Sequence, residues 1–133
     1  MNAPTDLLEA ARTARGNAHS PYSGFRVGAA IRLQSGAIFG GCNVENASYG
    51  ATICAERGAI CAAVAQHGAL QISEILVLSD ANPPWPPCGM CRQVIAEFAN
   101  PGCTVWCVNE SGEGSCQPFE SLFPRGFGAA DLA

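Results

Sequence analysis

The chain has 133 residues, which is enough to bury a single core without disulfides or a metal, so we expect any bound metal to serve chemistry. Its formal net charge is −4, and its seven basic residues are all arginines, scattered along the chain. Because no basic stripe is present to follow a phosphate backbone, we expect no nucleic-acid partner. A small neutral molecule remains a suitable ligand.

The first ten residues, MNAPTDLLEA, contain acids where a signal peptide would be basic and then apolar. No run approaches the roughly 18 apolar residues that a membrane span requires. We therefore expect a cytoplasmic protein without membrane association. Eight cysteines could form a disulfide framework in a secreted protein, but in a reducing compartment they stay thiols or bind metal.

The N-terminal half is predicted to contain a helix, a β-hairpin and a second helix. In chain order these are a helix from Pro4-Thr5 to Gly16, strands over 25–34 and 37–45 joined by a tight turn at Ser35-Gly36, and an alanine-rich helix over 54–67 that stops at Gly68.

The C-terminal half is predicted to contain a βαβ unit. Its parts are a buried strand over 72–79, a helix over 88–99 that follows the proline-rich loop 83–87 and ends at Asn100-Pro101-Gly102, and a buried strand over 103–109. The two strands should be parallel with a right-handed crossover. A mixed sheet covered by helices follows. No repeat or linker divides the chain, so we expect one domain over 1–133.

Three cysteines at the starts of the two later helices indicate a metal site. Cys54 begins one helix, and Cys88 and Cys91 share the first turn of the other. Unpaired backbone N–H groups and the helix dipole favour thiolates at such positions. Three protein ligands leave the fourth position of zinc open for water, whose pKa zinc lowers from about 15.7 to about 7.

The other cysteines and the two histidines are not expected to bind metal. Cys61 lies about 10 Å along the helix axis from Cys54, too far to share one ion. Spacing alone does not exclude the remaining four, but small apolar filler is the expected role of all five: Cys42, Cys61, Cys103, Cys107 and Cys116. His67 suits the C-terminus of its helix, and His19 carries no signal of a ligand.

Two charged residues, Glu56 and Arg57, lie two and three positions after Cys54. Glu56 suits the first turn of a helix without any chemistry, but beside an open metal site its carboxylate could shuttle protons. Arg57 could be a surface arginine, or it could donate to a ligand sulfur and reduce the net −1 charge of three thiolates around Zn²⁺.

The segments CAE and PCGMC fit the signature of zinc-dependent nucleoside and nucleobase deaminases, with Cys54 where many members carry histidine. Nearly the whole chain resembles the small homotetrameric cytidine deaminases, through PYSGFRVGAA, GCNVENASYG, CAERGAI, PCGMCRQV and LFPRGFGAADL. The resemblance implies a three-layer α/β/α sandwich with a mixed five-stranded sheet and one zinc ion per chain. It also implies hydrolysis of the cyclic amidine C–N bond of cytidine and 2′-deoxycytidine, giving uridine or 2′-deoxyuridine and ammonia in pyrimidine salvage.

Matched by position, the resemblance makes Cys54, Cys88 and Cys91 the zinc ligands and Glu56 the proton shuttle. The substrate-binding residues that it implies are Asn43 and Glu45 for the ribose, Phe25 and Tyr49 for the pocket lining, and the backbone of Ala55 for the base. Phe127, which local patterns would interpret as the anchor of a docked tail, is implied to reach a neighbouring active site within the tetramer.

Two other classes remain open on the residues alone. Trp85 shortly before Cys-x-x-Cys beside a βαβ unit is typical of a thiol-disulfide oxidoreductase, although that class leaves CAER unexplained. A non-catalytic zinc module would need a fourth protein ligand. Among deaminases, a relative acting on a modified nucleoside is also an alternative, which Asn43 and Glu45 disfavour.

Overall fold

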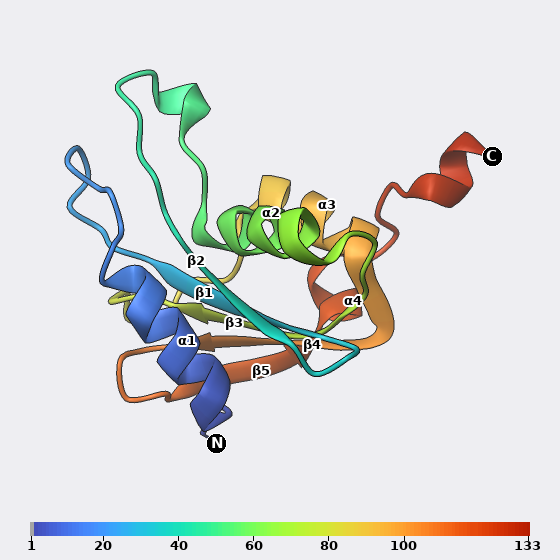
Figure 1. Ribbon diagram of the computed structural model, residues 1–133, viewed down its shortest axis with the longest axis horizontal. Helices are drawn as coiled ribbons and strands as arrows, with labels where there is room; N and C mark the ends of the chain where they lie inside the picture. Colours follow the sequence, from blue (N-terminus) through green and yellow to red (C-terminus); the bar gives the residue numbers. More distant parts are fainter. Residues whose placement is uncertain (1) are drawn as a thin grey trace.

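The computed structural model describes residues 2–133, which form one five-stranded sheet flanked by helices (Figure 1). The strand order is β2-β1-β3-β4-β5. The strands are β1 (Gly28–Leu33), β2 (Ile38–Cys42), β3 (Ile72–Leu78), β4 (Ala99–Val108) and β5 (Gly114–Pro118). Only the β3–β4 pair is parallel, and the other three neighbouring pairs are antiparallel. The predicted mixed sheet is therefore confirmed.

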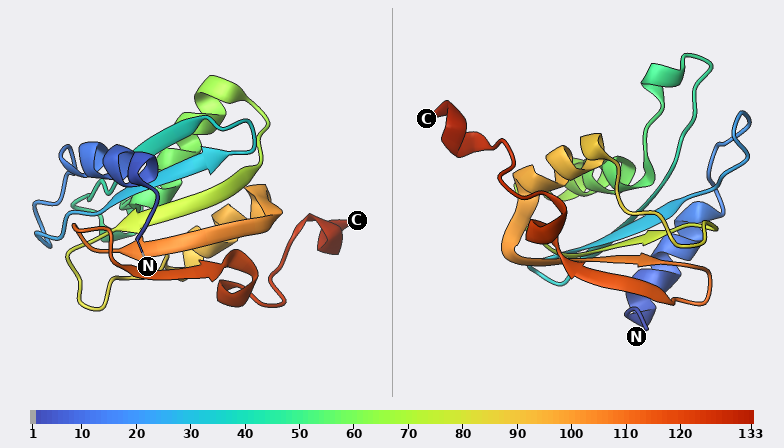
Figure 2. Two further views of the ribbon diagram at one scale, coloured as in Figure 1. Left: turned by 90° about the horizontal axis from the view of Figure 1, so that it is seen from below. Right: turned by 180° about the vertical axis from the view of Figure 1, so that it is seen from behind.

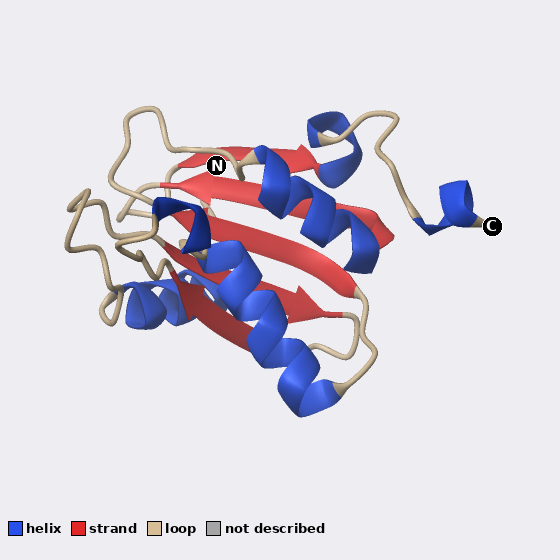
Figure 3. Cartoon of the chain, turned by 90° about the horizontal axis from the view of Figure 1, so that it is seen from above, coloured by secondary structure: helices blue, strands red, loops and turns tan. Residues whose placement is uncertain are grey.

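The helices form two layers around this sheet. They are α1 (Thr5–Arg15), α2 (Ala55–His67), α3 (Gly89–Phe98) and the short α4 (Phe119–Leu122), with 3-10 turns at Tyr49–Ala51 and Ala129–Leu132. Figure 3 shows α2 and α3 crossing the near face of the sheet, while α1 lies behind it. This arrangement confirms the expected α/β/α sandwich. Within residues 2–133, no helix combines the length and apolar character that a membrane crossing requires.

Each face of the sheet carries its own apolar core, because successive side chains of a strand point to opposite faces. On the α1 face, Leu7 and Ala11 pack with Leu76 and Leu78 of β3. On the opposite face, the core includes Ile60 of α2, Ile95 of α3 and three strand residues, Ile31, Ile75 and Val105. The central strand β3 is buried on both sides, which explains its nearly continuous apolar sequence.

Glycine sets the close approach of α2 to the sheet. A Cβ atom on Gly41 of β2 would lie 2.3 Å from the backbone nitrogen of Ala59 and 2.4 Å from the carbonyl oxygen of Ala55. Real Cβ atoms do not tolerate such contacts, so only glycine permits this spacing. Since Ala55 is the first residue of α2, the contact fixes the N-terminus of the helix that carries Cys54 and Glu56.

The hairpin strands are shorter than predicted at the ends nearest the site. β1 begins at Gly28 and β2 ends at Cys42, so the predictions over 25–34 and 37–45 were wrong at these ends. The Asn43 side chain replaces the strand ladder there: its Oδ1 accepts from the Val27 N–H at 2.9 Å, and its Nδ2 donates to the Phe25 carbonyl at 2.8 Å. The backbone thereby leaves the sheet and enters the site region.

The helix predicted over 88–99 ends earlier, at Phe98, and β4 begins at Ala99 rather than at residue 103. Ala99 pairs with Ile72, and a register shift then brings Thr104 opposite Glu74. The Asn-Pro-Gly sequence therefore lies at this irregular start of β4. The edge strand β5 and the short α4 have no local signal, because GSCQP is mostly exposed and lacks hydrophobic alternation.

Candidate active site and metal centre

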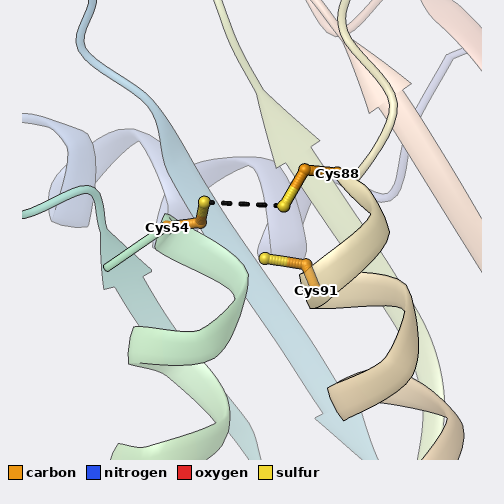
Figure 4. A group of neighbouring side chains, drawn as sticks. All are labelled: Cys54, Cys88 and Cys91. Atoms are coloured by element: carbon orange, nitrogen blue, oxygen red, sulfur yellow. Dashed lines mark hydrogen bonds between the residues drawn. The ribbon is translucent and has the colours of Figure 1, made fainter. Parts of the chain in front are cut away.

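The three predicted ligand cysteines lie together where α2 and α3 begin (Figure 4). Cys54 and Cys88 are the N-cap residues of α2 and α3, and Cys91 lies in the first turn of α3. All three sulfur atoms are within 4.8 Å of one another, and the Cys54 and Cys88 sulfurs are 3.8 Å apart. Across residues 2–133, no other group of three metal-ligating side chains is this close.

This spacing fits a tetrahedral zinc ion. Zn–S bonds of about 2.3 Å at tetrahedral angles place sulfur atoms about 3.8 Å apart, which matches the Cys54–Cys88 distance. The protonation of these cysteine thiols also bears on metal binding. Hydrogen bonding from Cys91, with help from Arg57, lowers the pKa of Cys54 to about 5, while that same hydrogen bond and burial raise the pKa of Cys91. A bound cation would favour the thiolate form of all three sulfurs.

Arg57 is placed to share this negative charge. Its Nη2 lies 3.5 Å from the Cys54 sulfur and donates to the Thr52 carbonyl at 3.2 Å. Its Nε is buried and has no hydrogen-bond partner within the described chain. The side chain therefore faces the sulfur cluster, as the sulfur-donating interpretation of the sequence requires.

Glu56 is buried beside the same cluster, with only 4% of its surface exposed. Burial is the main cause that raises the pKa of its carboxyl to about 7, and the nearby Cys54 adds to the effect. A carboxyl group that titrates near neutral pH can both accept and release a proton during one reaction cycle. Its position next to the predicted ligands provides the geometry that a proton shuttle requires.

A cavity of about 310 Å³ opens onto the metal centre. Its lining includes six of the residues predicted from the sequence besides Cys88: Phe25, Asn43, Glu45, Cys54, Ala55 and Glu56. Sulfur, carboxyl and apolar groups thus line a single cavity that is large enough for a nucleoside. The lining also contains residues that the sequence did not single out for this site: Ser23, Val27, Thr52, Val77, Trp85 and Pro86.

Trp85 is the most informative of these additions. Its ring meets the ring of Phe25 edge to face, with centroids 5.2 Å apart and planes at 64°. The sequence offered one signal, since Trp85 stands three residues before a metal ligand. That signal was interpreted only in the context of a thiol-disulfide oxidoreductase.

The predicted sugar-binding pair is held by backbone contacts. Asn43 is buried, and its side-chain amide forms hydrogen bonds with the backbone of Phe25 and Val27. Glu45 accepts from the Tyr22 N–H at 2.9 Å, from the Ser23 N–H at 3.1 Å and from the Ser23 hydroxyl. The Ser23 hydroxyl is the largest influence that lowers the pKa of Glu45, so this side chain presents an ionised acceptor.

Two of the predicted substrate-binding residues, Tyr49 and Phe127, are not brought into the cavity of their own chain. Tyr49 is 76% exposed and lines an adjoining hollow of about 320 Å³ together with Tyr22. This hollow shares Ser23, Glu45 and Thr52 with the main cavity. Phe127 is 55% exposed and belongs by sequence to the C-terminal arm, residues 123–133, whose end extends away from the sheet (Figure 2).

The remaining cysteines lie outside the sulfur cluster. Cys103 and Cys107 belong to the core on the α2 and α3 face, as expected of apolar filler, and burial raises their pKa values to about 12 and about 11. The same expectation was wrong for Cys61, which is exposed on α2. His67 ends α2 as predicted, and both it and His19 are exposed.

Comparison with known proteins gives a consistent result. Residues 1–107 match the family described as "Cytidine and deoxycytidylate deaminase zinc-binding region". A cytidine deaminase from Sporosarcina psychrophila is 41% identical over 127 residues, which cover 96% of this chain and 93% of that protein. The crystal structure of a cytidine deaminase from Burkholderia pseudomallei superposes with a TM-score of 0.87 at 41% identity, covering 94% of this chain and 99% of that chain.

A cytidine deaminase structure from Mycobacterium tuberculosis gives a TM-score of 0.79 at 33% identity and covers 92% of this chain and 95% of that one. The fold and the three-thiol centre with its buried carboxyl define a zinc-dependent deaminase. The chain belongs to the cytidine and deoxycytidylate deaminase zinc-binding family.

Proposed function

We propose that this protein catalyses the hydrolytic deamination of cytidine and 2′-deoxycytidine to uridine and 2′-deoxyuridine, with release of ammonia, as a step of pyrimidine salvage. The observation that carries the proposal is a cavity lined by buried Glu56, Asn43, Glu45 and two members, Cys54 and Cys88, of the three-cysteine cluster. Such a cavity offers a nucleophile site, a proton carrier and acceptors for sugar hydroxyls together.

Cys54, Cys88 and Cys91 would hold one zinc ion per chain. When bound, zinc supplies the Lewis acidity that activates water at neutral pH. The Cys54 sulfur would be supported by the Arg57 guanidinium, which lies 3.5 Å away and offsets part of the thiolate charge. Because a guanidinium stays protonated at any working pH, this support does not vary during the reaction.

Glu56 would move the protons. Its carboxylate accepts a proton from the attacking water, delivers it to N3 of the pyrimidine, and then transfers the second water proton to the departing amino group. Water and cytidine are thus converted to uridine and ammonia with no proton left over. A pKa near 7 suits both directions of transfer, since the group is neither too strong an acid nor too weak a base.

The other lining residues would orient the nucleoside. Glu45 and Asn43 would bind the sugar hydroxyls, and Phe25 would cover the base. The backbone N–H of Ala55 would hold the base, because it lies at the first position of α2, where N–H groups have no intrahelical partner. These contacts require no 2′-hydroxyl in particular, so both ribose and deoxyribose substrates are proposed.

We further propose a homotetramer in which Phe127 enters the cavity of a neighbouring subunit. Its exposure on the extended C-terminal arm supports this assignment, since a phenylalanine so placed is available to another copy. The exposed Tyr49 beside the cavity mouth is consistent with the same shared site. A cytoplasmic location is also proposed, because eight free thiols suit a reducing compartment.

One assay tests the proposed function. The purified, zinc-loaded protein is incubated with cytidine, and the ultraviolet change and ammonia release are followed together. Equal amounts of uridine and ammonia are expected. A thiol-disulfide oxidoreductase would instead reduce a disulfide substrate without zinc, and a deaminase of modified nucleosides would leave cytidine unchanged while consuming the modified substrate.

A further inference from the structure

Arg15, the last residue of α1, contacts two of the loops at the rim of the cavity. Its Nε donates to the carbonyl of Arg26 at 3.1 Å, and its terminal nitrogens pair with the carboxylates of Asp80 and Glu110. The Arg26 side chain in turn contacts the end of α1, because its Nη2 donates to the Gly16 carbonyl at 2.5 Å. Only 16% of the Arg15 side chain is exposed, whereas the Asp80 and Glu110 side chains are 63% and 53% exposed, so the arginine is packed in place while its carboxylate partners face solvent.

The first rim loop, residues 20–27, carries Phe25 directly before Arg26. The second rim loop, residues 79–87, begins with Ser79 and Asp80 and leads to Trp85. This second loop folds back on itself, because the Trp85 N–H donates to the Ser79 hydroxyl at 3.3 Å. A restraint on Asp80 therefore also restrains Trp85.

The two loops meet where their aromatic residues touch. Phe25 and Trp85 contact edge to face, and both line the cavity. Apart from this ring contact, the shared partner Arg15 links the loops from outside the cavity. A guanidinium suits this task, because its planar fork can donate to several acceptors at fixed angles.

We propose that Arg15 is a positioning residue that fixes the two rim loops relative to each other and so holds Phe25 and Trp85 against the pyrimidine ring. It contacts neither the sulfur cluster nor the cavity, and it acts through the carbonyl of Arg26 and the carboxylate of Asp80. The inference rests on the proposed function, since that function supplies the pyrimidine.

Arg12, one turn earlier on α1, provides a matched control. It pairs with Glu9 and with Glu110, and it also donates to the Glu110 carbonyl at 2.6 Å. Within residues 2–133, it makes no hydrogen bond or ion pair with either rim loop. Arg12→Gln therefore removes a comparable charge from the same carboxylate while leaving the rim loops fixed.

The kinetic test compares Arg15→Gln with Arg12→Gln. Arg15→Gln should raise the KM for cytidine about threefold to tenfold while kcat stays within about twofold, because a looser wall weakens ground-state and transition-state binding alike. Arg12→Gln should leave both constants within about twofold of the unmodified protein. An unchanged KM in Arg15→Gln, or an equal rise in Arg12→Gln, would overturn the proposal.

A second readout does not depend on turnover. The chain has two tryptophans, so a Trp106→Phe background leaves Trp85 as the only one. Acrylamide should quench Trp85 fluorescence more strongly after Arg15→Gln than after Arg12→Gln, and equal quenching would contradict the proposal. If the unmodified protein fails to deaminate cytidine, the proposed function fails, whereas the quenching comparison still decides the role of Arg15.

If Arg15→Gln does not fold, Asp80→Asn tests the same contact from the other partner. The Asp80 side chain is mostly exposed, so its replacement removes one arm of the contact without burying a new group. KM and quenching should both rise, by less than after Arg15→Gln. No change in either quantity would overturn the positioning role.

Discussion

The sulfur atoms of Cys54 and Cys88 lie 3.8 Å apart although the two residues begin different helices. Helices α2 and α3 pack on the same face of the sheet with their first turns adjacent (Figure 4). The N-terminal ends of both helices therefore direct free N–H groups and positive dipole potential at one point. This convergence makes the site suitable for thiolates and hence for zinc.

Loss of one ligand sulfur should remove metal and activity together. Cys88→Ala should bind much less zinc and lose cytidine turnover, because two thiolates cannot replace a three-ligand set. Cys61→Ala is the control, since this thiol is exposed on α2 outside the cluster. Zinc content measured by atomic absorption should be normal in the control, and full zinc occupancy in Cys88→Ala would disprove the ligand assignment.

The close packing of α2 against the sheet should depend on Gly41. A methyl group there would collide with the backbone of Ala55 and Ala59, so Gly41→Ala should destabilise the fold by about 1–3 kcal/mol, the usual cost of overpacking. Gly50→Ala is the control, because a Cβ on Gly50 meets no atom within 4 Å. Urea unfolding measures both free energies, and equal stability of the two variants would refute the steric argument.

Nucleoside affinity should fall in acid as Glu45 becomes protonated. The Ser23 hydroxyl holds the pKa of Glu45 below its ordinary value, so the acceptor is present above that lowered pKa and is lost as the pH falls through it. Ser23→Ala removes the largest cause and should move the loss of affinity to higher pH. Cytidine binding is measured in the Glu56→Gln background, which eliminates turnover and the titration of Glu56.

Zinc content is checked at each pH in this experiment, because acid also protonates thiolates. A Glu45→Gln variant provides the reference without this titration. Identical affinity profiles with and without the Ser23 hydroxyl would exclude the proposed link.

Phe127 should contribute to the site of a neighbouring subunit. Phe127→Ala should raise the KM for cytidine several-fold, because a stacked aromatic ring is worth about 0.5–1.5 kcal/mol beyond its buried area. Co-expressed Glu56→Ala and Phe127→Ala chains should form mixed oligomers in which some sites combine an intact Glu56 with an intact Phe127 from another chain. Those sites should add a low-KM component that neither parent has.

Differential tagging confirms that the mixed oligomers have formed. If they show only the high-KM component, Phe127 acts within its own chain or not at all.

Local sequence patterns predicted α1, α2, α3, the central strands and the pairing of Cys88 with Cys91, because each depends on spacing along a short segment. Cys88 and Cys91 are three apart on one helical turn, so their common direction follows from helix geometry. The early end of β2 at Cys42 could not be predicted in the same way. It depends on Asn43 hydrogen bonds to residues that lie 16 and 18 positions away.

The part of the cavity wall formed by Trp85 was missed for a related reason. Trp85 lies in a proline-rich loop without periodicity, and its partner Phe25 is 60 positions earlier. Only the folded arrangement of the two rim loops brings these rings together. The places of Tyr49 and Phe127 outside the cavity also have no local signal, since exposure depends on the path of the segments that carry them.

The most direct test of the central claim is the rate of cytidine deamination by zinc-loaded Glu56→Gln. The amide keeps the shape of the carboxyl but cannot carry a proton, so the variant should retain zinc and bind cytidine. Its kcat should fall by at least about 10² to 10⁴, the usual contribution of general acid–base catalysis. Turnover close to that of the unmodified protein, with zinc retained, would contradict the role of Glu56 and with it the proposed reaction.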